Sequence, residues 1–171
     1  MAFVALFDAC VLYPASLRDL LLRLARTNLF RARWSDQIHA EWMNAVLRER
    51  PELAGALQRT RALMDAAIDD CLVTGHEALI ASLQLPDADD RHVLAAAIIG
   101  RADFIVTSNL RHFPPETLSA YHIEAQHPDV FVRHVIDLDE AAALQAIREQ
   151  RESLRNPART VADFLDTLAR Q

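Results

Sequence analysis

The sequence has very little glycine and no lysine. Only 3 of its 171 residues are glycines. This excludes a glycine-rich phosphate-binding loop, and neither G-x-G-x-x-G nor G-x-x-x-x-G-K-[ST] occurs. All 18 basic residues are arginines, which hold phosphate through a planar fork. Five of them lie close together near the N-terminus: Arg18, Arg23, Arg26, Arg31 and Arg33. They indicate a solvated helix face or, alternatively, a local basic patch on an acidic protein.

Cysteine and long apolar runs are scarce as well. Cys10 and Cys71 form neither a C-x-x-C motif nor a Cys/His zinc pattern. Buried, reduced thiols in a cytoplasmic protein are therefore the expectation. The apolar N-terminal stretch lacks a basic region and contains Asp8, so we expect neither a signal peptide nor a membrane span. The net charge of -6 does not by itself indicate a nucleic-acid partner.

Short apolar runs alternate with helical patterns along the chain. Strands are predicted over residues 3–7, 29–34, 71–73, 104–107 and 121–125. Between them, helices are predicted after Pro14, over 38–46, from Pro51, and from Pro86 to a stop at Gly100. This alternation predicts an α/β fold of three α/β/α layers with a central, mostly parallel sheet of four or five strands.

The C-terminal part of the chain has a different character. Residues 138–154 form a charged helical pattern, Asn156-Pro157 interrupts it, and Thr160 is placed to cap a last amphipathic helix over 161–169. We therefore expect a domain over residues 1–135 and a helical extension over 136–171. The last helix needs a surface to cover its apolar face, on the domain or on a second subunit.

Four oxygen-bearing side chains stand where the predicted fold would gather them. Asp8 and Asn109 follow strands, and ligands of such sheets bind beyond the carboxyl ends of the strands. Glu41 borders the apolar stripe of its helix. Asp90 lies on the buried side of its helix, where an unpaired carboxylate is costly. Each has an ordinary alternative role as a turn residue, a boundary residue or a helix cap.

Together these four residues predict a metal site. Mg²⁺ and Mn²⁺ prefer carboxylate, amide and water oxygens. The sequence has no Cys/His cage for zinc. Crowding Asp8, Glu41 and Asp90 without a cation is expected to raise the pKa of at least one of them.

Three segments resemble the motifs of the PIN-domain family. They are VALFDACVL over residues 4–12, PDADDRHVLAAA over 86–97 and ADFIVTSNLRHF over 102–113. The helix of Glu41 takes the place of the second acidic motif. The similarity covers roughly residues 3–125 in motif order, and the spacing of the second and third segments is its specific part.

The resemblance implies an endoribonuclease that binds Mg²⁺ or Mn²⁺ and cleaves RNA. Asp8, Glu41 and Asp90 would then be catalytic metal ligands, with Asn109 beside them. Many bacterial members are toxins of the VapC kind, inhibited by a cognate antitoxin, and they are often homodimers. The family commonly has Asp at the position of Asn109, so we expect weaker metal binding here unless Asp89 or the RNA phosphate compensates.

Two other interpretations of the sequence remain. A phosphatase with an aspartate nucleophile would resemble D-x-D after the first strand, but Cys10 holds the second position and no lysine is present. A non-catalytic PIN-like binding or scaffold module is the other alternative. Metal-dependent RNA cleavage that disappears on removal of Asp90 separates the enzyme from the scaffold.

Overall fold

A four-stranded parallel sheet with the order β2-β1-β3-β4 forms the centre of the computed structural model, which describes residues 2–154. The strands are β1 (Phe3–Phe7), β2 (Phe30–Arg33), β3 (Phe104–Val106) and β4 (Glu124–Gln126). All three pairings are parallel, as expected when helices connect successive strands. The predicted α/β fold is confirmed, and the strands that end before Asp8 and Thr107 are direct neighbours.

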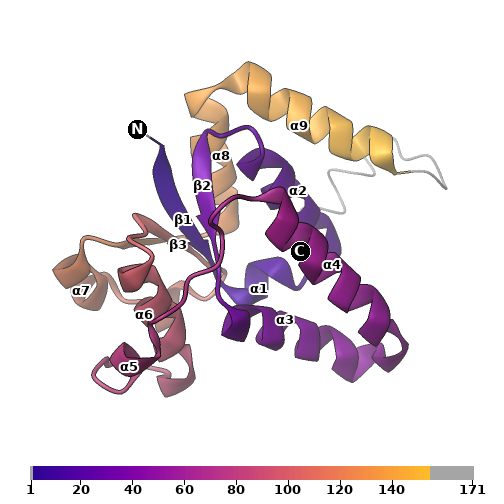
Figure 1. Cartoon of the computed structure of the whole chain (residues 1–171). Coiled ribbons are helices and arrows are strands. Elements are labelled where there is room, and N and C mark those ends of the chain that lie inside the picture. The colour runs from indigo at the N-terminus through magenta and orange to yellow at the C-terminus, as the bar shows by residue number, and fades with distance from the viewer. Residues whose placement is uncertain (1, 155–171) are drawn as a thin grey trace.

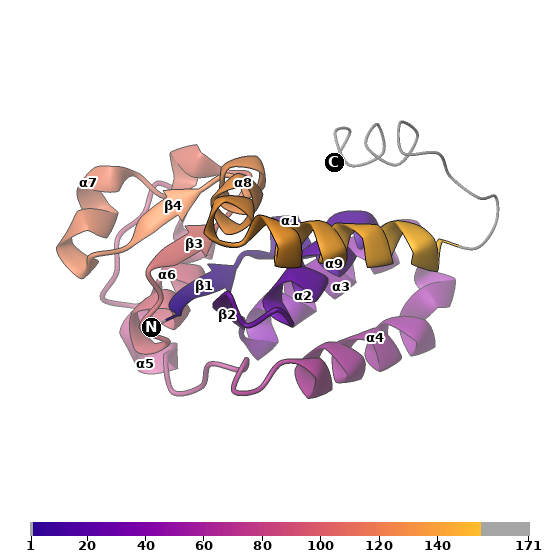
Figure 2. The same ribbon diagram turned by 90° about the horizontal axis from the view of Figure 1, so that it is seen from above.

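Helices cover both faces of this sheet (Figures 1 and 2). They are α1 (Ala9–Leu12), α2 (Ala15–Ala25), α3 (Asp36–Glu49), α4 (Ala54–Ala67), α5 (Glu77–Ile80), α6 (Arg91–Ile99), α7 (Pro115–Leu118), α8 (Pro128–Leu138) and α9 (Glu140–Ser153). Short 3-10 turns lie at Pro51–Leu53, Ala88–Asp90, Leu110–His112 and Ser119–Tyr121. The layered arrangement matches the three-layer α/β/α prediction.

The two faces of β1 are buried by different helices. Phe3 and Phe7 lie on the same side of the strand, because successive side chains point to opposite faces and these two are four residues apart. Both rings make edge contacts with Phe131 of α8, with centroids 6.1 and 6.0 Å apart. The apolar helix α6 packs against β1 and β3, and its residues from His92 to Ala97 are buried. The continuous apolar sequence of β1 is therefore explained by burial on both sides.

One predicted strand was wrong. Residues 71–73 form a single parallel bridge between Leu72 and Trp34 beside the end of β2. Asp70 and Gly75 on either side have φ of 56° and 79°, so turns flank the segment and leave it too short for a strand. Gly100 ends α6 as predicted, but it has an ordinary φ of -74°. A Cβ there would lie 2.8 Å from the carbonyl oxygen of Ala96, so close packing is what requires this glycine.

Helix α8 has no counterpart among the predicted elements. It crosses the predicted boundary between residues 135 and 136, and it buries Phe131 and Val135 in the core. Helix α9 packs along α2, and the side-chain amide of Gln150 donates a hydrogen bond of 2.8 Å to the carbonyl oxygen of Ser16. The helix predicted over 161–169 lies outside the described residues.

No helix in the described part of the chain has the length and apolar character needed to cross a membrane. Cys10 and Cys71 are free thiols, half-buried and buried respectively. The pKa of each thiol is raised to about 11, mainly by burial, so both are protonated near neutral pH.

Candidate metal centre

Asp8 follows β1 and is fixed from two sides. Its Oδ1 accepts a hydrogen bond of 2.7 Å from the backbone N–H of Ala9, which begins α1. Its Oδ2 accepts a bond of 2.8 Å from the hydroxyl of Thr107, at the end of the neighbouring strand β3. Asp8 is 4% exposed, and this burial raises the pKa of its carboxyl group, with a smaller contribution from the charge of Glu41. The carboxylate is thus held rigidly at the carboxyl edge of the sheet.

Asp90 is the N-cap residue of α6, yet its side chain makes no capping hydrogen bond. Its Oδ2 instead lies 2.8 Å from Nδ1 of His112. Burial raises the pKa of Asp90, and the charge of Asp8 raises it further. The structural role that the sequence left open, a cap for the helix, is therefore not what this carboxylate performs.

Glu41 reaches the same region from α3. Its Oε1 lies 2.6 Å from Nε2 of His92, a buried residue of α6. An ionised carboxylate only accepts hydrogen bonds, so the imidazole donates. The Nδ1 atom of His92 is buried without a partner in the described part of the chain, so the contact with Glu41 is the one hydrogen bond of this ring there.

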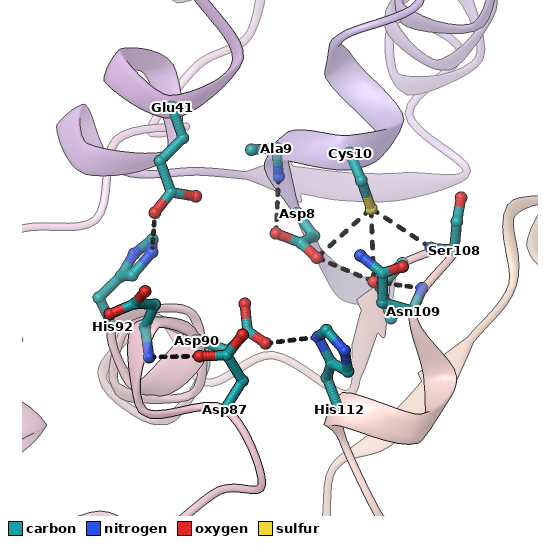
Figure 3. A network of polar contacts seen from close by, with 12 residues as sticks. Asp8, Ala9, Cys10, Glu41, Asp87, Asp90, His92, Ser108, Asn109 and His112 are labelled. Atoms are coloured by element: carbon teal, nitrogen blue, oxygen red, sulfur yellow. Dashed lines mark hydrogen bonds and ion pairs between the residues drawn. The ribbon is translucent and has the colours of Figure 1, made fainter. Parts of the chain in front are cut away.

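Asp8, Glu41 and Asp90 are therefore brought together from three separate parts of the sequence. Figure 3 shows their carboxylates around one space, with Glu41 and His92 on one side and Asp90 and His112 on the other. The pKa values of Asp8 and Asp90 are raised, as predicted, but burial contributes more than repulsion between the charges. The crowded, partly desolvated acids create a place for a cation.

Asn109 lies at the rim of this region. Its side chain is exposed, and its backbone N–H donates to the hydroxyl of Thr107 at 3.1 Å. Figure 3 shows it beside Cys10 and Ser108, on the side of Asp8 away from Glu41. Asp89, which was considered as a compensating acid, is also exposed.

Other residues supply ligand atoms that the sequence analysis did not select. Ligand atoms of Asp87, Asp90 and His112 all lie within 4.8 Å of one another, the spacing of a possible cation site. This group shares Asp90 with the predicted set of metal ligands, and it contains Asp87 and His112 where the predicted set has Asp8 and Glu41. His112 was visible three residues after Asn109 in the third motif, while His92 and Thr107 gave no signal of their contacts.

Four of the five N-terminal arginines contact other side chains of the domain. Arg23 pairs with Asp19 at 3.0 Å, and Arg31 and Arg33 pair with Asp70 at 3.6 and 2.8 Å. The guanidinium of Arg18 lies 4.5 Å from the centroid of the Trp42 ring. These contacts favour the interpretation of solvated and paired side chains over a basic patch.

Comparison with known proteins agrees with the motifs. Residues 4–111 match the family model of the PIN domain, and residues 128–171 match a model described as the VapC50 C-terminal domain. A protein of Mycobacterium tuberculosis named "Putative ribonuclease VapC50" is 42% identical over 97 residues. The matched region covers 57% of this chain and 57% of that relative.

Proposed function

The chain belongs to the PIN-domain family, and from this premise we propose that it is an endoribonuclease that hydrolyses RNA phosphodiester bonds with Mg²⁺ or Mn²⁺. The observation that carries the proposal is the carboxylate of Asp90. It stands at a helix N-terminus without capping it, it faces Asp8, and its pKa is raised by burial and, to a smaller extent, by the charge of Asp8. A carboxylate in that position is explained by a cation that it binds.

The donor set fits such a cation. Asp8, Glu41 and Asp90 offer the oxygen ligands that Mg²⁺ and Mn²⁺ prefer, and Asn109 adds an amide oxygen at the rim. Asp87 brings a further ligand atom close to Asp90. Such an ion supplies Lewis acidity toward the phosphate and activates water for attack.

The protein's own part is to orient the three acids. Thr107 holds Asp8, His92 holds Glu41 and His112 holds Asp90, at 2.8, 2.6 and 2.8 Å respectively. Hydrogen bonds of this kind fix metal-ligating carboxylates, and their loss typically costs about 10- to 100-fold in metal affinity or activity. We assign Asp8, Glu41 and Asp90 as the catalytic metal ligands and Thr107, His92 and His112 as positioning residues.

We further propose that the protein is the toxin of a toxin–antitoxin pair in the cytoplasm, because its relative bears a VapC name and the C-terminal region matches a VapC50 model. We also propose that residues 1–135 form the nuclease domain and 136–171 the extension. Induced expression should stop bacterial growth, and co-expression of the protein encoded beside it should restore growth. Growth unaffected by an active nuclease would contradict the toxin role.

The decisive experiment is RNA cleavage by the purified chain with Mg²⁺ or Mn²⁺ and with EDTA. Asp90→Asn should lower the cleavage rate by at least about 100-fold, since removal of a group that stabilises transition-state charge has effects of that order. Asp89→Asn is the matched control, being one residue away and exposed, and should cleave at the parental rate. Cleavage that persists in EDTA, or in Asp90→Asn, would contradict metal-dependent catalysis at Asp90. No cleavage by the purified chain under any of these conditions would leave the non-catalytic scaffold as the better interpretation.

A further inference from the structure

A recess adjoins the proposed metal centre between α1 and α3. Its volume is about 410 Å³, and its lining includes Cys10, Tyr13, Trp42 and Arg48. Glu41, one of the three proposed metal ligands, belongs to the same lining. A group bound in the recess would therefore lie beside a phosphate held by a metal ion at the three acids.

The aromatic wall of the recess is held in place before anything binds. The hydroxyl of Tyr13 donates a hydrogen bond of 3.1 Å to Oε2 of Glu49 on α3. Arg18 donates to the backbone carbonyl oxygens of Leu12 and Tyr13 at 2.7 and 3.3 Å, while its guanidinium lies over the Trp42 ring. These bonds fix the turn that carries Tyr13, so the ring offers a flat surface at little cost in conformational entropy.

The recess is lined by one cation, Arg48, and by two acids, Glu41 and Glu49. Arg48 is exposed and forms no ion pair with any described residue, whereas Arg23, Arg31 and Arg33 are paired with acids. Its guanidinium is free to bind a phosphate. The recess thus combines an aromatic ring, one arginine without an ion-pair partner among the described residues, and two acids, of which Glu41 belongs to the proposed phosphate-cleaving centre and Glu49 accepts from Tyr13.

From this combination we propose that the recess binds one unpaired nucleobase of the RNA, adjacent to the scissile phosphate, with the base against Tyr13 and a flanking phosphate on Arg48. The substrate class is then single-stranded RNA, because a base stacked and paired within a duplex cannot enter. The inference rests on the proposed nuclease function and adds the residues that select the nucleotide. A protein segment that offers a basic side chain to Glu41 or Glu49 is the other conceivable occupant, and RNA affinity unchanged in both recess variants described below would favour it.

The test is the binding of a short, fluorescently labelled single-stranded RNA in the presence of Ca²⁺, with a gel to verify that the RNA stays intact. Stacking of a base on an aromatic ring is worth about 1–3 kcal/mol, so Tyr13→Ala should raise Kd roughly 5- to 100-fold. Tyr13→Phe keeps the ring and should bind within about 2-fold of the parent. Tyr121→Ala is the matched control, because Tyr121 is the other tyrosine of the chain and is 40% exposed.

A second variant keeps the test informative if Tyr13→Ala folds poorly. Arg48→Ala removes an exposed side chain at the end of α3. It should weaken binding and reduce the dependence of log Kd on log salt by about one unit, as expected for one lost phosphate contact. Cross-linking with 4-thiouridine-containing RNA should label the peptides of α1 and α3.

The outcomes separate this proposal from the function on which it rests. Mn²⁺ affinity should be the same in Tyr13→Ala and the parent, since Tyr13 is not a metal ligand. If RNA affinity and cleavage are unchanged in both Tyr13→Ala and Arg48→Ala, the recess does not bind a nucleobase, and the proposed nuclease function is unaffected. Loss of RNA binding in Tyr13→Ala, in a protein that never cleaves RNA, would support the recess and reject the nuclease. Equal binding of duplex RNA, or cross-links confined to other helices, would also overturn the proposal.

Discussion

Two clusters in this molecule are built around aspartates, and their surroundings are opposite. Oδ1 of Asp65 accepts a hydrogen bond of 2.8 Å from the indole N–H of Trp34, and it lies 2.9 Å from Nε2 of His39. Arg61 lies 3.8 Å from its other oxygen. Asp8, in contrast, is near two further carboxylates, Glu41 and Asp90. One acid is surrounded by donors, whereas the other acids face one another.

The difference shows how one residue type serves two purposes. Around Asp65 the fold supplies the compensating hydrogen atoms, and the arrangement continues to Trp42, whose indole N–H donates to Nδ1 of His39 at 3.0 Å. Such a satisfied network stabilises the fold. Asp8 accepts hydrogen bonds from Ala9 and Thr107, and Asp90 is paired with His112, but each of the two aspartates also faces another carboxylate. A site of that kind costs stability and is suited to binding a cation.

The largest expected effect is on stability at the Asp65 cluster. Asp65→Ala removes the acceptor of two buried donors, each of which costs about 1–3 kcal/mol when unsatisfied, so the free energy of unfolding should fall by roughly 2–5 kcal/mol. Asp90→Asn should change it by less than about 0.5 kcal/mol or raise it, because a repulsive charge is removed. Denaturant unfolding in EDTA measures both, and the reverse order of effects would contradict the comparison.

Stabilisation by a bound metal ion should depend on Asp90 and should not depend on Asp65. At about 100 times Kd, Mn²⁺ should stabilise the parent by roughly 2.7 kcal/mol through mass action. Asp65→Asn should respond as the parent does, whereas Asp90→Asn should show a much smaller shift in Tm. If Mn²⁺ shifts the Tm of Asp90→Asn as far as that of the parent, Asp90 is not a ligand.

The pH dependence of the metal-free protein should differ as well. The folded-state pKa values of Asp8 and Asp90 are raised above their ordinary value of 3.8. The folded state therefore holds more protons than the unfolded state, and these groups make stability fall as the pH rises from 3.8 through the raised values. Unfolding of the parent and of Asp90→Asn across this range should show a smaller decline in the variant. An equal or steeper decline in Asp90→Asn would count against the raised pKa of Asp90.

The smallest effect concerns the rim. Asn109→Asp adds a fourth acid at an exposed position. We expect Mn²⁺ affinity to rise by about 3- to 10-fold if the side chain reaches the ion, and metal-free stability to fall by less than about 1 kcal/mol, as expected for a surface substitution. Isothermal titration calorimetry measures the affinity. No change in affinity would place Asn109 outside the coordination sphere.

The sequence predicted the strands and the acids because both are local signals. An apolar run that ends in Asp8, and another that ends before Asn109, mark the carboxyl edge of a parallel sheet without any knowledge of tertiary contacts. The contacts of His92 and His112 could not be predicted in the same way. His92 meets Glu41 from a position 51 residues away, and only the tertiary placement of α6 relative to α3 decides which atoms meet.

Helix α8 had a local signal that the sequence analysis did not use. His127 caps its first turn through Nδ1, which accepts from the backbone N–H of Asp129 at 3.2 Å. Phe131 and Val135 recur at a spacing of four residues and are both buried, the pattern of an amphipathic helix. At Leu72 the local signal was instead misleading. The apolar residues 71–73 resemble a strand, but the turns on either side limit the segment to a single bridge.

The hydrogen bond between Thr107 and Asp8 spans 99 residues, and this long separation has a consequence for synthesis on the ribosome. Asp8 is translated first, but its partner strand β3 and His112 are added about 100 residues later. Parallel pairing of such distant segments is also slow, because loop-closure entropy must be overcome before the contacts form. Until β3 and His112 have left the ribosome, a nascent chain of this protein therefore carries no assembled acidic centre beside the ribosomal RNA.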